Sequence, residues 1–217
     1  MPKVDNAIIL AAGFGSRFVP LTFELPKGLI PVKGVPMLER QIQQLRERGI
    51  DDIIIVVGYL KEKFDYLIDK YNIKLIFNPD FAKRNNLSSL YYARDYLKNS
   101  YILSADNWMR NNIFHAEETG SWYSCVFKSG ESSEWCVTTS DSGRITGVTI
   151  GGTDSWVMYG PVFLSQSFND VFRDMVEMYH RKPGAENYMW ENVFIDEIER
   201  LELYINKQDA DNVYEFE

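Results

Sequence analysis

The sequence is poor in the residues on which several catalytic and metal chemistries depend. It has 2 histidines and 2 cysteines in 217 residues. His115 and His180 stand far apart in the chain, so neither a histidine-based zinc site nor a Ser-His-Asp triad is expected. Cys125 and Cys136 lack the CxxC spacing of a redox or zinc motif. We expect both to be free thiols of a cytoplasmic protein.

Long hydrophobic runs and an excess of basic residues are missing too. No apolar stretch approaches the roughly 18 residues that a membrane helix needs, and the run at 7–12 is too short for the core of a signal peptide. Lys and Arg number 23 against 31 Asp and Glu, which gives a net charge of −8. We therefore expect no binding to membranes or to nucleic acids.

What is present indicates a folded α/β protein. Hydrophobic residues make up 45% of the chain and charged residues 25%, enough for both a core and a soluble surface. The length predicts a single domain over residues 1–217. The short acidic end at 212–217 leaves open that the chain is one domain of a longer polypeptide.

The order of the expected elements predicts a Rossmann-like sheet. In the first half, continuous apolar runs alternate with helical stripes, as in βαβ units whose mostly parallel sheet carries helices on both faces. The second half adds apolar runs separated only by turns, which predict antiparallel strands, and then two further helices. The expected strands are 7–12, 53–57, 74–77, 101–105, 122–127, 135–139, 144–150 and 156–164, and the expected helices are 38–45, 60–71, 87–97, 168–179 and 190–201.

A glycine-rich turn follows the first expected strand, where open α/β sheets bind ligands. Its sequence is Leu10-Ala11-Ala12-Gly13-Phe14-Gly15-Ser16-Arg17. Phe18 stands where a dinucleotide motif needs a third glycine, and no Gly-Lys-Ser/Thr follows as in a P-loop. The backbone amides and the Arg17 guanidinium suit a triphosphate. A tight turn with a solvated arginine is the alternative.

Three charged residues are candidates for binding a phosphate or a metal ion near this turn. Lys27 lies on a proline-rich loop and would act as a point charge for a phosphate, or simply be solvated. Asp106 follows an inner strand, where its carboxylate suits Mg²⁺, although a turn aspartate is also common there. Glu191 opens the last expected helix, where the helix dipole alone would explain an acid.

Aromatic residues account for 14% of the chain, and several fall in its second half. Such residues could enclose an ammonium group by cation–π attraction, with an acid beside them, or could belong to the core. The candidates are Glu134, Trp135, Tyr159, Tyr188 and Trp190.

Together these residues resemble the sugar-phosphate nucleotidyltransferase superfamily, and within it the bacterial choline-phosphate and 2-aminoethylphosphonate cytidylyltransferases. The resemblance extends over nearly the whole chain. Its opening motif and the following Pro-Lys are specific for nucleotidyl transfer, and the later segments narrow it to the cytidylyl branch. The segments are Leu10-Ala11-Ala12-Gly13-x-Gly15-x-Arg17, Pro26-Lys27, Gly49 to Tyr59, Asn85-Asn86-Leu87-Ser88-Ser89-Leu90, Asp106 and Trp190-Glu191.

The resemblance implies a role for each matching residue. Lys27 and Arg17 would neutralise charge on the reacting phosphates, and Asp106 with Glu191 would hold Mg²⁺. The aromatic set and Glu134 would face the cationic end of the acceptor. The residues implied to bind the base and triphosphate of CTP are Leu10, Ala11, Ala12, Gly13, Gly15, Ser16, Arg17, Asn85, Asn86 and Ser89.

Two departures from the choline-phosphate pattern concern the acceptor and the metal. Met189-Trp190-Glu191 replaces the Tyr-Trp-Asp of those enzymes, so one aromatic is lost and the carboxylate is longer. A primary ammonium, as in 2-aminoethylphosphonate, can donate hydrogen bonds to acids and needs a full aromatic box less. Ser104 stands where the family often has a second acid, so it is not expected to be a ligand.

The sequence thus predicts an enzyme that transfers CMP from CTP to a small phosphorylated or phosphonate amine, releasing pyrophosphate. The acceptor is 2-aminoethylphosphonate or phosphocholine. A fused or partner domain of the same pathway is compatible with this function. The alternatives are a sugar-1-phosphate nucleotidyltransferase that uses UTP or dTTP and a CTP-sensing module without catalysis.

Overall fold

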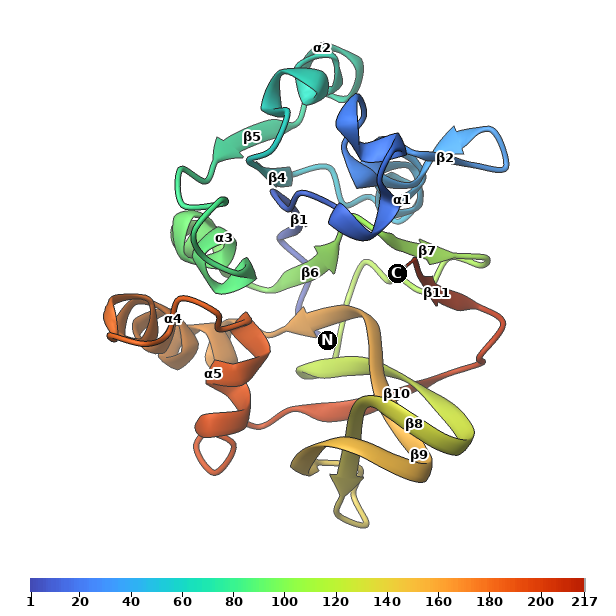
Figure 1. Ribbon diagram of the computed structural model, residues 1–217. Helices are drawn as coiled ribbons and strands as arrows, with labels where there is room; N and C mark the ends of the chain where they lie inside the picture. The colour runs from blue at the N-terminus through green and yellow to red at the C-terminus, as the bar shows by residue number, and fades with distance from the viewer. Residues whose placement is uncertain (217) are drawn as a thin grey trace.

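A seven-stranded sheet forms the centre of the computed structural model, which describes residues 1–216 (Figure 1). The strand order is β10-β8-β9-β6-β1-β4-β5. Its inner part is parallel, since β1 pairs with β4 and with β6, and β4 pairs with β5. These strands are β1 (Asn6–Ala11), β4 (Ile53–Val57), β5 (Lys74–Phe77) and β6 (Ser100–Ser104). The expected parallel half is therefore confirmed, to within one residue at each strand.

Two long strands replace the four shorter ones expected in the second half. β8 (Trp122–Thr139) and β9 (Ile145–Leu164) pair antiparallel, β9 joins the edge of β6, and β10 (Tyr204–Gln208) runs parallel to β8. The expected breaks are register shifts inside the ladder, near Gly130 and Gly151, whose φ angles are 78° and 81°. Because bulges and left-handed glycines bend a hairpin without ending its hydrogen bonding, turn residues there do not mark strand ends.

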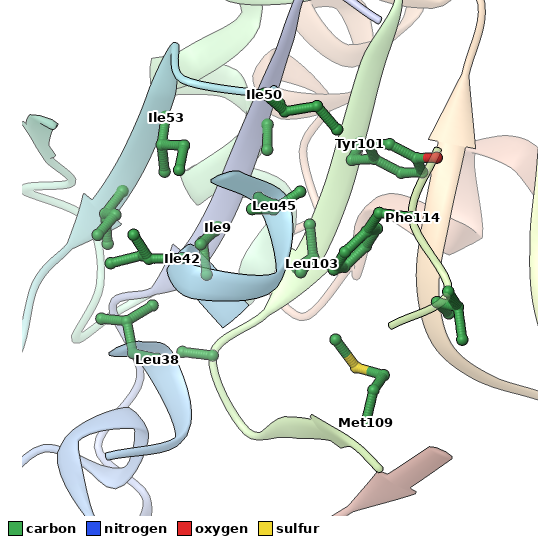
Figure 2. Packing of buried hydrophobic residues seen from close by; sticks show 14 of the residues in the cluster. Ile9, Leu38, Ile42, Leu45, Ile50, Ile53, Tyr101, Leu103, Met109 and Phe114 are labelled. Atoms are coloured by element: carbon green, nitrogen blue, oxygen red, sulfur yellow. The ribbon is translucent and has the colours of Figure 1, made fainter. Parts of the chain in front are cut away.

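Helices cover both faces of the sheet, as expected. Ile9 and Leu103 point to the face that carries α1 (Met37–Arg46) and α2 (Tyr66–Tyr71), as the packing of Leu38, Ile42 and Leu45 in Figure 2 illustrates. Their neighbours in the strands, Ile8 and Ile102, point to the other face. That face carries α3 (Asn86–Ala93), α4 (Gln166–Arg181) and α5 (Trp190–Asp196). The alternation follows from the two-residue repeat of a strand.

Several short elements could not be anticipated from periodicity. Two small antiparallel pairs form, β2 (Pro31–Val32) with β3 (Val35–Pro36) and β7 (Asn107–Met109) with β11 (Val213–Glu215). The expected helix over 60–71 begins as a 3₁₀ turn, Lys61–Phe64, and the last helix ends at Asp196 rather than near 201. Within residues 1–216, no helix has the length and apolar character to cross a bilayer.

Candidate active site

A cavity of ≈ 340 Å³ opens at the carboxyl ends of β1 and β6. β1 connects to β4 on one side and borders β6 on the other, so the strand order reverses between β1 and β6. Open α/β sheets bind ligands at such a reversal. All ten residues that sequence analysis assigned to the nucleotide line this cavity: Leu10, Ala11, Ala12, Gly13, Gly15, Ser16, Arg17, Asn85, Asn86 and Ser89. Their contact with CTP stays a prediction.

The glycine-rich turn is held by its own residues. Gly15 has a φ of 61°, in the left-handed region that favours glycine, and caps a 3₁₀ turn, Ser16–Phe18. The Thr22 hydroxyl donates to the Gly15 carbonyl at 2.9 Å. A Cβ on Gly15 would lie 3.0 Å from side-chain carbons of Thr22 and Lys27. The turn therefore packs directly against the loop that carries Lys27.

Lys27 and Asp106 form an ion pair on the cavity wall. The Lys27 ammonium donates to Asp106 Oδ2 at 2.8 Å, and the side chains are 14% and 21% exposed. Gly28 makes this approach possible, because a Cβ there would lie 2.7 Å from the Cβ of Ala105. The ammonium also lies 4.7 Å from the centre of the Phe18 ring. Two of the three predicted catalytic residues are thus in contact, and the third, Arg17, lines the same cavity.

Glu191 is buried, and among the residues that the structure describes it is not one that lines the cavity. It is 8% exposed, and its Oε1 accepts a hydrogen bond from the Tyr123 hydroxyl at 3.2 Å. Burial raises the pKa of its carboxyl to about 7, against the opposing effect of hydrogen bonds that include those from Tyr123 and Asn86. Asn86 itself lines the cavity. Asn86 also accepts a hydrogen bond from the backbone N–H of Trp190 at 2.8 Å, so it connects the cavity lining to the first turn of α5.

A second acid, which no sequence pattern predicted, lies near Tyr123. Glu215, in the short strand β11, pairs with Asn107 and lines the cavity. Its backbone N–H donates to the Tyr159 hydroxyl at 3.0 Å, and that hydroxyl donates to the Glu215 carbonyl at 3.2 Å. Burial first, and then the charges of Glu191 and Glu215, hold the pKa of the Tyr123 hydroxyl well above its ordinary value. We call Tyr123, Glu191 and Glu215 the acidic corner.

The five residues expected to bind the acceptor are placed differently. Among the residues that the structure describes, none of the five lines the 340 Å³ cavity. Trp190 is 2% exposed and packs against Tyr123 and Phe172, with ring centres 5.9 and 6.0 Å apart. Trp135 and Tyr188 pack against the same side of the core. Their direct contact with an acceptor is an untested prediction, and core packing accounts for their aromatic character.

Glu134 and Tyr159 lie on the β8–β9 hairpin. Glu134 Oε1 is 3.9 Å from the Lys128 ammonium, which in turn lies 4.9 Å from the centre of the Tyr159 ring. Tyr159 reaches the cavity indirectly, through its hydrogen bonds with the backbone of Glu215. Of the five, Tyr159 and Trp190 are joined by hydrogen bonds to cavity residues, because the backbone N–H of Trp190 donates to Asn86 Oδ1 at 2.8 Å.

Three further residues of the cavity wall were also missed. Asn78, Phe81 and Arg84 come from the segment between β5 and α3. Asn78 follows β5 directly, as Asp106 follows β6 almost at once, so the strand-end argument used for Asp106 would have found it. No comparable signal in the sequence indicates Phe81, Arg84 or Glu215.

A larger cavity of ≈ 940 Å³ lies elsewhere, between the first turn of α4 and β10. Its lining includes Ser165, Val171 and Lys207 and none of the predicted site residues. The 340 Å³ cavity is the one that holds the Lys27–Asp106 pair, so we take it as the candidate active site.

Comparison with known proteins agrees with this geometry. Residues 7–109 match the MobA-like NTP transferase domain. The chain is 35% identical to the choline-phosphate cytidylyltransferase of Streptococcus pneumoniae over 212 residues, which cover 98% of this chain and 93% of that protein. It is 35% identical to the 2-aminoethylphosphonate cytidylyltransferase of Lancefieldella rimae over 216 residues, covering 98% of this chain and 88% of that protein.

A solved structure extends the likeness to three dimensions. The CTP:phosphocholine cytidylyltransferase from Streptococcus pneumoniae superposes with a TM-score of 0.94 at 36% identity, covering 97% of this chain and 92% of that one. The expected nucleotidyltransferase fold is confirmed by this match. The chain is therefore an enzyme of the nucleotidyltransferase superfamily and belongs to the family of choline-phosphate and 2-aminoethylphosphonate cytidylyltransferases.

Proposed function

We propose that this enzyme transfers CMP from CTP to 2-aminoethylphosphonate and releases pyrophosphate. The observation that carries the proposal is the Lys27–Asp106 pair, 2.8 Å apart, on the wall of a cavity that the glycine-rich turn also lines. A cation beside backbone amides suits the triphosphate, and a carboxylate beside it suits a metal-bound phosphate. We propose the cytoplasm as its location, in keeping with the two free, buried thiols.

The reaction needs charge neutralisation more than proton transfer. A phosphonate oxygen of the acceptor attacks the α-phosphorus of CTP in line, a new P–O bond forms, and the bond to the bridging oxygen of the β-phosphate breaks. That oxygen leaves with the electron pair as part of pyrophosphate. The attacking oxygen is already anionic, so no general base is required. Lys27 and Arg17 would hold the phosphates in line and absorb the charge that develops on the leaving group.

The carboxylates fit a divalent metal ion, for which Mg²⁺ is our proposal. Asp106 Oδ1 and Glu191 Oε2 are both buried and have no hydrogen-bond partner within residues 1–216. Buried, unpartnered carboxylate oxygens match the preference of Mg²⁺ for hard oxygen ligands. Asp106 and Glu191 would hold the ion. When bound, Mg²⁺ would neutralise phosphate charge and polarise the α-phosphoryl group.

The acidic corner favours an acceptor with a primary ammonium. Glu215 lines the cavity and supplies a carboxylate near Tyr123, and Tyr159 is hydrogen-bonded to the Glu215 backbone. An –NH₃⁺ group can donate three hydrogen bonds to such acceptors, whereas the trimethylammonium of phosphocholine can donate none and depends on aromatic faces. Trp190 presents no face to the cavity, being buried in the core. These features favour 2-aminoethylphosphonate over phosphocholine.

A direct test is pyrophosphate release from CTP and Mg²⁺ with each acceptor in parallel. We expect a higher kcat/KM with 2-aminoethylphosphonate than with phosphocholine, and none without an acceptor. Faster turnover of phosphocholine would reverse the acceptor assignment. Turnover of glucose-1-phosphate with UTP or dTTP would favour the sugar-nucleotide alternative. Binding of CTP without pyrophosphate release, with every acceptor tested, would favour a sensing module.

A further inference from the structure

A chain of hydrogen bonds joins the end of β5 to the first turns of α3 at the cavity wall. It begins at Asn78, which is 1% exposed and lines the cavity. The backbone N–H of Asp80 donates to Asn78 Oδ1 at 2.9 Å. Because a backbone N–H can only donate, this side of the Asn78 amide must be the oxygen. The amide NH₂ group must therefore face α3.

Both hydrogens of that NH₂ group are used on neighbouring serines. Asn78 Nδ2 donates to Ser88 Oγ at 2.8 Å and to Ser89 Oγ at 3.0 Å. Ser88 donates its own hydrogen to the Asn85 carbonyl at 2.8 Å. The Ser88 hydroxyl therefore accepts one hydrogen bond and donates one, so its hydrogen is not available to a ligand.

Ser89 is in a different position. Its Oγ accepts from Asn78, so its hydrogen cannot point that way, and within residues 1–216 that hydrogen has no acceptor. Ser89 is 4% exposed and lines the cavity. The direction of the Asn78 amide therefore keeps the Ser89 hydrogen available to a ligand, in a place where leaving it unpaired is costly.

Cytosine and uracil differ in what they offer such a hydrogen. Ring nitrogen N3 of cytosine is an acceptor, whereas N3 of uracil carries a hydrogen and is a donor. A uracil N3–H could use the remaining lone pair of Ser89, but the Ser89 hydrogen would then stay buried without a partner. Sites that leave a buried polar group unpaired reject the wrong ligand strongly.

We infer that Asn78 is a positioning residue for base selection, and that it holds the Ser89 hydroxyl as a donor to N3 of the cytosine ring. The inference rests on the proposed function, since it assumes that CTP occupies the cavity. Asn78 acts through Ser89 and does not itself contact the reacting atoms.

The first test uses the unmodified enzyme. CTP is compared with 3-deaza-CTP, in which a C–H group replaces N3, by pyrophosphate release with 2-aminoethylphosphonate and with phosphocholine. We expect kcat/KM to fall about tenfold for 3-deaza-CTP, the effect of one lost hydrogen bond that leaves a buried donor unpaired. Equal kcat/KM values for CTP and 3-deaza-CTP would overturn the inference. Absence of turnover with CTP itself would instead contradict the proposed function.

The second test reverses the direction of the hydrogen bond. In Asn78→Asp the carboxylate can still accept from Asp80 N–H, but toward α3 it can only accept, so Ser89 would turn its hydrogen away from the base. We expect kcat/KM for CTP to fall about tenfold and that for UTP not to fall, which narrows the CTP/UTP ratio. In this variant kcat/KM for 3-deaza-CTP should equal kcat/KM for CTP. If the folded variant keeps the original ratios of kcat/KM for CTP over UTP and for CTP over 3-deaza-CTP, the inference is overturned.

Ser88→Ala is the matched control. It removes the other hydroxyl bonded to the same amide and leaves the Asn78–Ser89 bond in place. We expect the CTP/UTP ratio and the 3-deaza-CTP penalty to stay at their original values. An equal change in Ser88→Ala and Asn78→Asp would mean that Asn78 only supports the local fold. If Asn78→Asp does not fold, the comparison of the two nucleotides on the unmodified enzyme decides the question.

Discussion

The predicted nucleotide side and the proposed acceptor side of the site are built in different ways. On the nucleotide side, the glycine-rich turn, Asn78 and Asp106 follow the ends of β1, β5 and β6, parallel strands whose carboxyl ends lie at one edge of the sheet. On the acceptor side, Tyr123, Glu191 and Glu215 come from β8, α5 and β11. A general rule of sheet geometry positions the first group. Strand pairing and helix packing particular to this chain position the second.

The largest effect on activity is expected when the charge of Lys27, on the nucleotide side, is removed. In Lys27→Met the chain keeps a side chain of similar length but loses the charge beside Asp106. Because the ammonium is proposed to stabilise charge that develops on the phosphates, kcat should fall about 10²–10³-fold. Steady-state pyrophosphate release measures this. Lys63→Met, at an exposed lysine of the 3₁₀ turn Lys61–Phe64, is the control and should keep full activity. A kcat within a few-fold of the original would remove Lys27 from catalysis.

The difference between the two sides explains what the sequence could predict. The strand-end rule is sufficient to predict the sites of Gly13 and Asp106, whereas Lys27 was predicted from its loop and Ser89 from the family resemblance. All four line one cavity. Asn78 obeys the same rule, because it directly follows β5. The parallel half is predictable since buried strands have continuous apolar runs and their helices have a 3.6-residue repeat.

The acceptor side lacks such signals. Glu215 lies in a strand of 3 residues, too short for a periodic pattern, and its partner Asn107 is more than a hundred residues away in the chain. The predicted aromatic set also shows the limit of composition. An abundance of tryptophan and tyrosine is equally expected for a core and for an ammonium site, and Trp190 belongs to the core. The bends of the β8–β9 hairpin depend on left-handed glycines, which in sequence look like turns.

A smaller and more selective effect is expected on the acceptor side. Glu215→Gln keeps the shape of the side chain and the strand pairing but removes a charge near Tyr123. We expect the KM for 2-aminoethylphosphonate to rise about tenfold, because an ammonium loses a charged partner, while the KM for CTP stays the same. Glu202→Gln, an exposed acid that lines the other cavity, is the control. Equal increases in both KM values would mean that the two sides are not separate in function.

The smallest effect should come from Glu39, which stabilises the nucleotide half without reaching the cavity. Its carboxylate accepts hydrogen bonds from the Tyr66 and Tyr71 hydroxyls, each at 2.7 Å, and from Lys70 at 2.6 Å, so it links α1 to α2. Burial alone would raise the pKa of Glu39, but the hydrogen bonds from Lys70, Tyr71 and Tyr66 outweigh it and lower the pKa.

The sign of the pH effect follows from that lowered pKa. A carboxyl with a lower pKa in the folded state adds stability above its unfolded pKa, and this contribution is lost as the pH falls through the folded value. In Glu39→Gln we expect the free energy of unfolding to fall by about 1 kcal/mol at neutral pH. The difference from the original protein should shrink under acid, while KM for CTP and for the acceptor should both stay unchanged. Denaturant unfolding at several pH values measures this, with the exposed Glu62→Gln as control. A difference that grew as the pH fell would contradict the assignment, and a changed KM for CTP would show that the α1–α2 face and the nucleotide cavity are coupled.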